Sequence, residues 1–206
     1  AVTTVTSDID FGKVGTYTII GGADANKFAI NPATGALRFI TAPNYEAPSD
    51  SDANGIYAVK VQVSDGVGGI DIQDITITVK DINEAPIISG NGAKASLVVS
   101  ENTKAVTTVT ATDVDASETL TYSISGTDAS LFTIDASTGA LSFVNAPNYE
   151  VPADSGANNI YDVTVTVTDK GGLTSSRDMS ISVANVNEAP EITNNAGAQS
   201  IGVNIA

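Results

Sequence analysis

Hydrophobic and polar residues alternate along several short stretches of this chain. In one of them, Tyr57, Val59, Val61 and Val63 are separated by small or polar residues, and residues 75–79 and 161–167 repeat the pattern. A period of two places successive side chains on opposite faces of a β-strand, so each stretch predicts a strand with one buried and one solvated face. Turn signals such as Thr34-Gly35 and Gly171-Gly172 separate the stretches. Together they predict an all-β sandwich.

The pattern occurs twice. Residues 28–86 align with residues 132–190 at a constant offset of 104, and roughly half of the positions are identical. A repeat of about 100 residues has the size of a whole domain. We therefore expect two tandem seven-stranded Greek-key sandwiches, at residues 1–86 and 87–190. The chain starts at the equivalent of Ala105, so the first sandwich is expected to lack its first strand.

The last residues extend the repeat. Residues 192–206 align with residues 88–102 and are expected to form the first strand of a following repeat, which we place at 191–206. Two explanations stay open. The sequence can be a window cut from a longer array. Alternatively, the last strand of one molecule can complete the first domain of the next, which would give a head-to-tail filament.

Paired aromatic residues suggest a structural role. Every tyrosine and all but one phenylalanine have an equivalent in the other repeat, and the simplest interpretation is that these residues form the two cores. The paired residues are Tyr17, Tyr45, Tyr57, Tyr122, Tyr149, Tyr161, Phe28, Phe39, Phe132 and Phe143. Phe11 has no equivalent, so Phe11 and the loops are the candidates for contact with a polysaccharide.

The amino-acid composition narrows the range of possible functions. The formal net charge is −15, and the chain has no Cys, His or Trp. Such an acidic surface repels nucleic acid and anionic membranes and attracts divalent cations. Zinc, a histidine general base and a cysteine nucleophile are all disfavoured by the missing residue types. The sequence contains no stretch of 18 apolar residues, so no transmembrane helix is predicted.

The carboxylates occupy recurring places in the repeat. Asp-x-Asp occurs at residues 8–10 and 113–115, and an aspartate closes a predicted strand at residues 65 and 169. A glutamate follows a tyrosine at residues 46 and 150. The stretch between the repeats reads Asp81-Ile82-Asn83-Glu84-Ala85-Pro86, and Glu101-Asn102 lies near the predicted first strand of the second repeat.

This set of motifs resembles the cadherin repeat, and the resemblance covers essentially the whole chain. It implies Greek-key sandwiches joined end to end, with Ca²⁺ held at each junction. The short linker Asn83-Glu84-Ala85-Pro86 and the lack of cysteine are similar to the cadherin-like repeats of large secreted bacterial adhesins. The acids are then explained by a repeated metal-ligand pattern rather than by a catalytic cleft, so no enzyme is expected.

The resemblance also implies the ligands. Calcium takes six to eight oxygen ligands, more than one strand end supplies. For the junction between the repeats the implied ligands are Glu46, Asp81, Asn83, Glu84, Glu101, Asp113, Asp115 and Asp169. Parts of the two outer junctions are implied at Asp8, Asp10, Asp65, Glu150, Asn185, Asn187 and Glu188. The sequence departs from the family pattern at Asn44 and Asn148, because cadherin repeats have an acidic residue at this position.

Two other patterns have simpler explanations. Residues 50–55 begin like an EF-hand loop, but Val61 occupies the twelfth position, where that loop needs a glutamate, so we expect a polar turn. Thr164, Thr166 and Thr168 lie on one face of a predicted strand, where threonine is an ordinary choice for a solvated sheet.

The expected function is a calcium-stiffened, extracellular stalk and adhesion segment whose partners are neighbouring repeats of the same protein. The alternative is a module that itself binds a polysaccharide, a surface receptor or another copy of the chain. Neither nucleic acid nor membrane insertion is expected.

Overall fold

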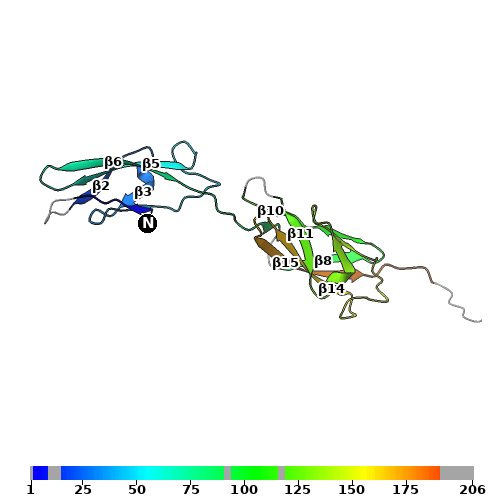
Figure 1. The fold of residues 1–206 in the computed structure, drawn as a ribbon. Coiled ribbons are helices and arrows are strands. Elements are labelled where there is room, and N and C mark those ends of the chain that lie inside the picture. The colour runs from blue at the N-terminus through cyan, green and yellow to red at the C-terminus, as the bar shows by residue number, and fades with distance from the viewer. Residues whose placement is uncertain (1, 9–14, 91–93, 116–118, 191–206) are drawn as a thin grey trace, which may run out of the picture. The chain divides into compact units, whose positions relative to one another are not determined.

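The computed structural model describes residues 2–8, 15–90, 94–115 and 119–190. The chain divides into two compact units, which are described separately below (Figure 1). The first comprises Ala1–Glu84 with Val114–Ser117, and the second comprises Ala85–Asp113 with Glu118–Ala206. Residues 191–206, predicted as the strand of a following repeat, lie outside the described part. Within that part, no helix has the length and apolar character needed to span a membrane.

The first unit is a sandwich of two three-stranded sheets. Its strands follow the predicted alternation, and the 3-10 turn η1 (Ala25–Lys27) precedes β3. In Figure 1, β5 and β6 run together in one layer and β3 lies in the other. One sheet has the order β1 (Thr3–Thr4), β4 (Ala36–Phe39), β3 (Phe28–Ile30), and the other β2 (Thr16–Gly21), β5 (Ile56–Ser64), β6 (Ile70–Thr78).

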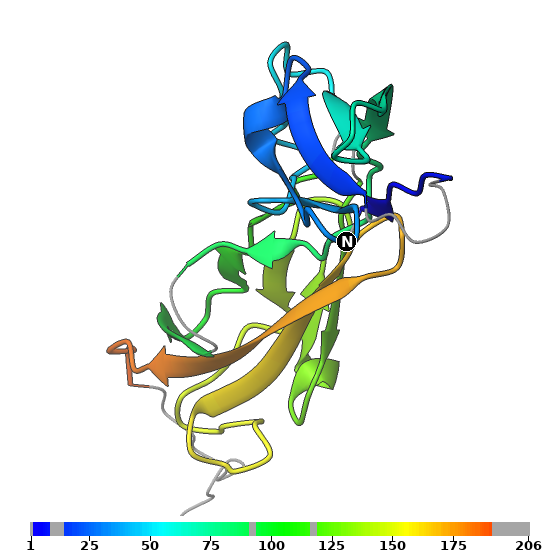
Figure 2. The same cartoon turned by 90° about the vertical axis from the view of Figure 1, so that its left-hand side faces the viewer.

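Among the described residues, the second unit has three more strands than the first. A four-stranded sheet faces a three-stranded sheet, and a short ladder joins β7 (Ile87–Ile88) to β10 (Ala111–Thr112). Figure 2 shows the long strands β14 and β15 side by side. One sheet has the order β11 (Thr121–Ser125), β14 (Ile160–Thr168), β15 (Thr174–Ala184), β8 (Lys94–Ser100), and the other β12 (Phe132–Ile134), β13 (Ala140–Phe143), β9 (Ala105–Thr108), with η2 (Ala129–Leu131) before β12.

The two units differ at one sheet edge. In the second unit β8 pairs in parallel with β15 over seven residues, from Asp178↔Lys94 to Ala184↔Ser100. In the first unit β6 occupies the place of β15, and among the described residues it pairs with β5 alone. The prediction of two all-β sandwiches is therefore confirmed, and the described part of the first unit has no strand at the place of β8.

Both cores are built around the same three rings. Phe28, Phe39 and Tyr57 pack against one another with ring centroids 4.5–6.2 Å apart. Phe132, Phe143 and Tyr161 repeat this arrangement. Edge-to-face contacts at such distances are favourable for aromatic pairs. The interpretation of most paired aromatic residues as core residues agrees with this packing.

Two tyrosines depart from that interpretation. Tyr45 and Tyr149 are 47% and 39% exposed and are not core residues. They lie in the long connections between β4 and β5 and between β13 and β14, where the chain has no alternating pattern to direct side chains inward. Equivalence between repeats therefore identified a conserved position without showing that it is buried.

A buried aspartate fastens each of these long connections to the sandwich. Asp128 accepts hydrogen bonds from the backbone N–H groups of Ser155 and Asp162, both at 2.8 Å. Asp24 makes the equivalent bonds with Ser51 and Ala58. The sequence analysis missed both aspartates, although their identical position in the two repeats was a usable signal. They hold the loop that begins at residue 50 or 154 against the end of the neighbouring strand.

The loop at residues 50–55 forms the polar turn that was expected. Both carboxylate oxygens of Asp50 accept backbone hydrogen bonds, from Asn54 at 2.8 Å and Gly55 at 3.1 Å. Asp52 accepts a bond from the side chain of Asn54. These oxygens are engaged in closing the turn, as are those of Asp154 in the second unit.

We predict that Asp128→Ala lowers the free energy of unfolding of the second unit by about 2–4 kcal/mol. The substitution leaves two backbone N–H donors without their acceptor, and each lost partner costs about 1–3 kcal/mol. Urea unfolding followed by circular dichroism measures the change. Thr127→Ala, at the exposed neighbouring position, is the control and should stay within about 0.5 kcal/mol of the native chain.

Candidate metal centre

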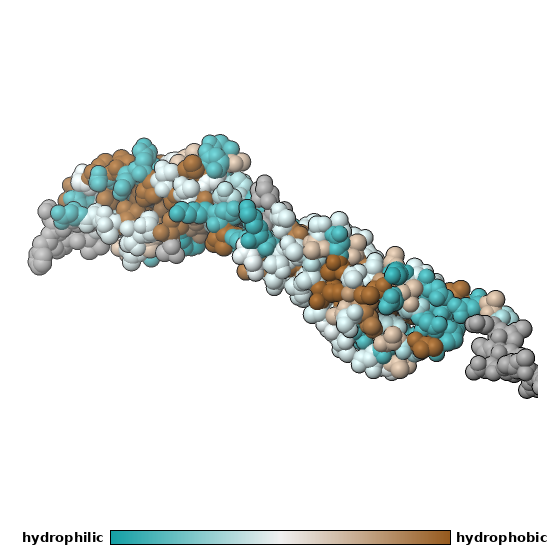
Figure 3. Space-filling model, turned by 45° about the vertical axis from the view of Figure 1, so that its right-hand side comes forward, coloured by the Kyte–Doolittle hydropathy of each residue, from teal (hydrophilic) through white to brown (hydrophobic). Residues whose placement is uncertain are grey.

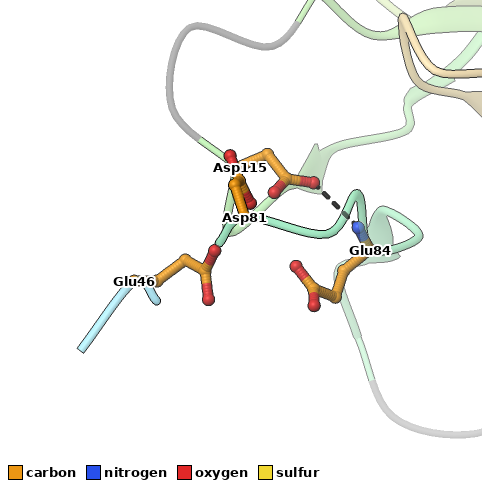
Figure 4. A group of neighbouring side chains, drawn as sticks. All are labelled: Glu46, Asp81, Glu84 and Asp115. Atoms are coloured by element: carbon orange, nitrogen blue, oxygen red, sulfur yellow. Dashed lines mark hydrogen bonds between the residues drawn. The ribbon is translucent and has the colours of Figure 1, made fainter. Parts of the chain in front are cut away.

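Four carboxylates of the first unit lie close together. One oxygen atom from each of Glu46, Asp81, Glu84 and Asp115 lies within 4.8 Å of the others. Glu46 belongs to the connection after β4, Asp81 and Glu84 follow β6, and Asp115 follows β10 (Figure 4). The backbone N–H of Glu84 donates a hydrogen bond to Asp115 Oδ2 at 3.0 Å, which fixes the two residues relative to each other. We call these four residues the first acidic cluster.

The first acidic cluster has the dimensions of a calcium site. Calcium binds oxygen at 2.3–2.6 Å, so two ligand atoms on opposite sides of one ion are about 5 Å apart. The four oxygens fall within that span. Hard carboxylate oxygens without sulfur or imidazole suit Ca²⁺ better than zinc or copper. The residues present therefore fit a calcium ion.

Electrostatics within the cluster also favour a cation. Loss of hydration next to neighbouring groups, followed by the negative charges of Glu46, Asp115 and Asp81, raises the pKa of the exposed Glu84 above its ordinary value of 4.5. Each additional negative charge at this spacing disfavours ionisation of its neighbour. A divalent cation would remove that repulsion. The pocket beside Glu46 and Glu84 has a volume of about 490 Å³ and is also lined by Tyr45.

A second acidic cluster lies in the second unit. It consists of Glu101, Glu150 and Glu188, whose carboxylate oxygens are again within 4.8 Å of one another. Glu150 and Glu188 are the repeat equivalents of Glu46 and Glu84. Asn185 stands at the place of Asp81, and its side-chain amide donates to Glu150 Oε1 at 2.7 Å. One acid of the first cluster is thus replaced here by a neutral hydrogen-bond donor.

Glu101 is the most enclosed acid of either cluster, at 2% exposure. Its two oxygens accept backbone hydrogen bonds from Tyr149 at 2.8 Å and Val186 at 2.7 Å. These two bonds lower the pKa of the carboxyl group. Glu101 therefore joins the connection after β13 to the segment that follows β15, in addition to any role as a ligand.

The position of Glu101 corrects one expectation. It was assigned to the same site as Glu46 and Asp81, but it groups with Glu150 and Glu188 instead. The reason is strand direction. β8 runs parallel to β15, so Glu101 emerges at the same end of the sheet as the residues after β15, and its N–H bonds to Ala184 O. The motif order alone did not reveal the direction of this pairing.

The other implied ligands lie outside the two clusters. Asp65 and Asp169 close the turns after β5 and β14 by accepting hydrogen bonds from the N–H groups of Gly69 and Leu173, each at 2.8 Å. Asn83 donates to Glu84 O at 3.3 Å, and Asp113 is partly buried next to β10. Asp8 and Asn187 are exposed, and Asp10 is not among the described residues. Binding by these residues stays a prediction.

The raised pKa of Glu84 gives a test of the first cluster in excess chelator. The folded unit holds this proton more tightly than the unfolded chain, so stability falls as the pH rises from the ordinary glutamate pKa through the raised value. We predict that Glu84→Gln melts at a higher temperature than the native chain at pH 7, and that the difference shrinks towards pH 4. Asp71→Asn, an exposed change on β6, is the control. Equal melting temperatures of Glu84→Gln and the native chain at pH 7 would argue against repulsion in the cluster.

Comparisons with known proteins identify the repeat. Residues 95–184 match the family model of the cadherin domain. Human protocadherin Fat 1 is 30% identical over 186 residues, which is 86% of this chain and 4% of that protein. Human cadherin-related family member 2 is 30% identical over 204 residues, 93% of this chain and 15% of that protein. The chain thus spans only a small part of the length of these relatives.

Solved structures agree on the fold. The crystal structure of mouse cadherin-23 EC22-24 is 26% identical, with a TM-score of 0.52 over 84% of this chain and 53% of that chain. The structure of human protocadherin-24 EC1-2 (form II) is 22% identical, with a TM-score of 0.59 over 90% of this chain and 88% of the other, which shows a common fold.

These matches confirm the resemblance to cadherin repeats. They also confirm the expectation that the chain is not an enzyme, because the cadherin repeat is a non-enzymatic adhesion fold. The sequence repeat, the paired sandwiches and the family match lead to one conclusion: this chain is built from tandem repeats of the cadherin family, and residues 95–184 are its matched cadherin domain.

Proposed function

We propose that the chain is a calcium-binding segment of an extracellular adhesion stalk, with Ca²⁺ held by the first acidic cluster. The observation that carries the proposal is the spacing of Glu46, Asp81, Glu84 and Asp115, whose oxygens lie within 4.8 Å of one another. Four carboxylates at this spacing repel one another strongly without a cation and provide most of a calcium coordination sphere with one. The second acidic cluster is proposed as the equivalent, less charged site.

Calcium would act mainly by fixing the linker. Asp81 and Glu84 belong to the stretch between the repeats, whereas Asp115 lies between β10 and β11 in the sequence. An ion shared by these residues would hold the linker to residue 115, and its removal would leave the stretch to self-repulsion. A string of repeats stiffened in this way would present a binding end at a distance from the cell surface. Neighbouring repeats of the same protein are then the first partners.

A bacterial origin of the stalk is proposed from the linker and from the lack of cysteine. Asn83-Glu84-Ala85-Pro86 and the lack of cysteine are similar to the repeats of large secreted bacterial adhesins. The relatives named above are animal proteins. The parent protein, its receptor and its localisation at the cell surface therefore belong to the proposal.

Self-association is the second candidate function, and one observation favours it. Among the described residues, the edge of β6 opposite β5 has no strand beside it. A sheet edge of this kind can accept a strand from another chain. Binding of a polysaccharide through Phe11 or the loops is the remaining alternative, and a glycan array with the native chain tests it directly.

We predict that millimolar Ca²⁺ raises the melting temperature relative to excess chelator. Asp115→Ala should remove most of the part of this rise that the first acidic cluster contributes. An ion that binds only the folded state adds about 2.7 kcal/mol per site at 100 times its dissociation constant. Calorimetry with and without calcium measures both shifts. Asp71→Ala, which removes an exposed acid outside the clusters, should keep the full shift. An unchanged calcium effect in Asp115→Ala would remove the first cluster from the proposal.

Terbium luminescence assigns the ion to a cluster. The chain contains no tryptophan, so tyrosine is the donor for sensitised Tb³⁺ emission. Tyr45 lines the same pocket as Glu46 and Glu84. We predict that Tyr45→Phe lowers the emission from the first cluster and leaves the calcium-dependent melting shift intact, whereas Glu46→Gln lowers both. Tyr149→Phe is the matched change in the second repeat. Emission that Tyr45→Phe and Glu46→Gln leave untouched would place the ion elsewhere.

A further inference from the structure

An open hollow of about 230 Å³ lies on the solvated face of the four-stranded sheet of the second unit. Its lining includes polar or charged residues from three strands and a glycine from the turn after β11. These residues are Asp162 and Thr164 of β14, Asp178 of β15, Lys94 of β8, and Gly126. The residues that alternate with them along β14 and β15 are buried in the core, so the polar side chains face solvent.

The strand register brings these polar side chains together. Thr164 is paired with Asp178, and Asp178 is paired with Lys94. Neighbouring strands lie about 4.8 Å apart, so this row spans about 10 Å across the sheet. Thr164 Oγ1 donates a hydrogen bond to Asp178 at 2.7 Å. Lys94 Nζ lies 3.5 Å from Asp162 Oδ1. A carboxylate accepts several hydrogen bonds and an ammonium group donates more than one, so both contacts leave capacity for a ligand.

The wall of the hollow next to β14 is formed without a side chain. Gly126 has a φ of 110°, a conformation that other residues rarely adopt. A Cβ atom at this position would lie 3.2 Å from the backbone nitrogen of Thr164. Glycine therefore lets the turn after β11 approach β14 closely, with no side chain between them.

The first unit does not have the same groups at the equivalent positions. Lys60 stands at the place of Thr164. Asp74 stands at the place of Asp178 and forms an ion pair with Lys60 at 3.2 Å. An alanine stands at the place of Asp162. The carboxylate that remains in the first unit is thus neutralised by its neighbour on the adjacent strand, whereas the second unit presents two carboxylates and a hydroxyl group.

The chemistry of the hollow selects one class of ligand. Two carboxylates against one ammonium group, in a chain with a net charge of −15, disfavour an anion. The Lys94 ammonium group competes with a metal ion for Asp162. An apolar ligand would remove water from charged groups without replacing its hydrogen bonds. The hydroxyl groups of a neutral sugar, in contrast, both donate to carboxylates and accept from an ammonium group.

We propose that this hollow binds a sugar unit of a neutral polysaccharide. Hydroxyl groups of the sugar donate to Asp162 and Asp178 and accept from Lys94. Much of the visible surface of the second unit is pale in Figure 3, the colour of residues with intermediate hydropathy such as serine and threonine. The inference rests on the polysaccharide alternative and places the contact on the sheet rather than at Phe11 or the loops. It does not rest on the calcium site, because the hollow shares no residue with either acidic cluster.

Affinity electrophoresis measures such binding with defined probes. The native chain is run in gels that contain dextran, galactomannan or hydroxyethyl cellulose, which are neutral, and in gels that contain alginate, which is anionic. A gel without polysaccharide gives the reference mobility. We expect at least one neutral polysaccharide to retard the chain and alginate to leave its mobility unchanged. Retardation by alginate alone, or by none of the four, would overturn the proposal.

Matched substitutions locate the site. Asp178→Asn keeps the shape of the side chain but removes its charge, and it should weaken binding of the retarding polysaccharide at least tenfold, because an ionised acceptor forms the stronger hydrogen bond. Asp74→Asn makes the same change at the equivalent position of the first unit and should leave binding unchanged. Thr164→Lys copies the first unit, and its ion pair with Asp178 should abolish binding. Retardation that neither Asp178→Asn nor Thr164→Lys reduces would reject this hollow as the site.

The melting temperature separates this inference from the calcium site. All three substitutions lie on the solvated faces of the sheets and outside the acidic clusters, so each variant should keep its fold and its calcium-dependent melting shift. Loss of polysaccharide binding with an intact shift would support the hollow. A native chain that binds the polysaccharide but shows no calcium-dependent shift would count against the calcium site alone.

Discussion

The parallel pairing of the first strand with the last strand governs much of this structure. Where β8 lies beside β15, the core-facing side chains of β15 are buried. Glu101, which follows β8, lies at the end of this sheet close to Glu150 and Glu188. Where no described strand takes that place, Ile75, Ile77 and Val79 stay partly exposed. One backbone ladder therefore determines both the completeness of a core and the membership of an acidic cluster.

The two acidic clusters differ at an equivalent position of the repeat. The first contains four acids, and Asp81 supplies a charge where the second has Asn185 bonded to Glu150. The second has Glu101, held by two backbone N–H groups, at a place that no described residue fills in the first. At the one position that both clusters share and that differs, the first has the charge of Asp81 and the second has the neutral amide of Asn185.

Alternation and the repeat offset were sufficient to predict the two sandwiches. The resemblance to the cadherin repeat placed Glu46, Asp81, Glu84 and Asp115 in one group, and their oxygens lie close together. The resemblance was insufficient for Glu101, because motif order does not contain the direction of strand pairing. Asp24 and Asp128 were missed because a single buried acid without a motif looks like any other turn residue. Tyr45 and Tyr149 were misassigned because equivalence between repeats carries no information on exposure.

The parallel ladder between β8 and β15 also has a mechanical consequence. The chain enters β8 at Lys94 and leaves β15 at Ala184, so tension applied through the two ends pulls these strands in opposite directions along their length. All of the hydrogen bonds between them are then loaded together in shear, rather than opened one at a time from an end. Under tension, the second unit would therefore resist extension through this whole ladder at once.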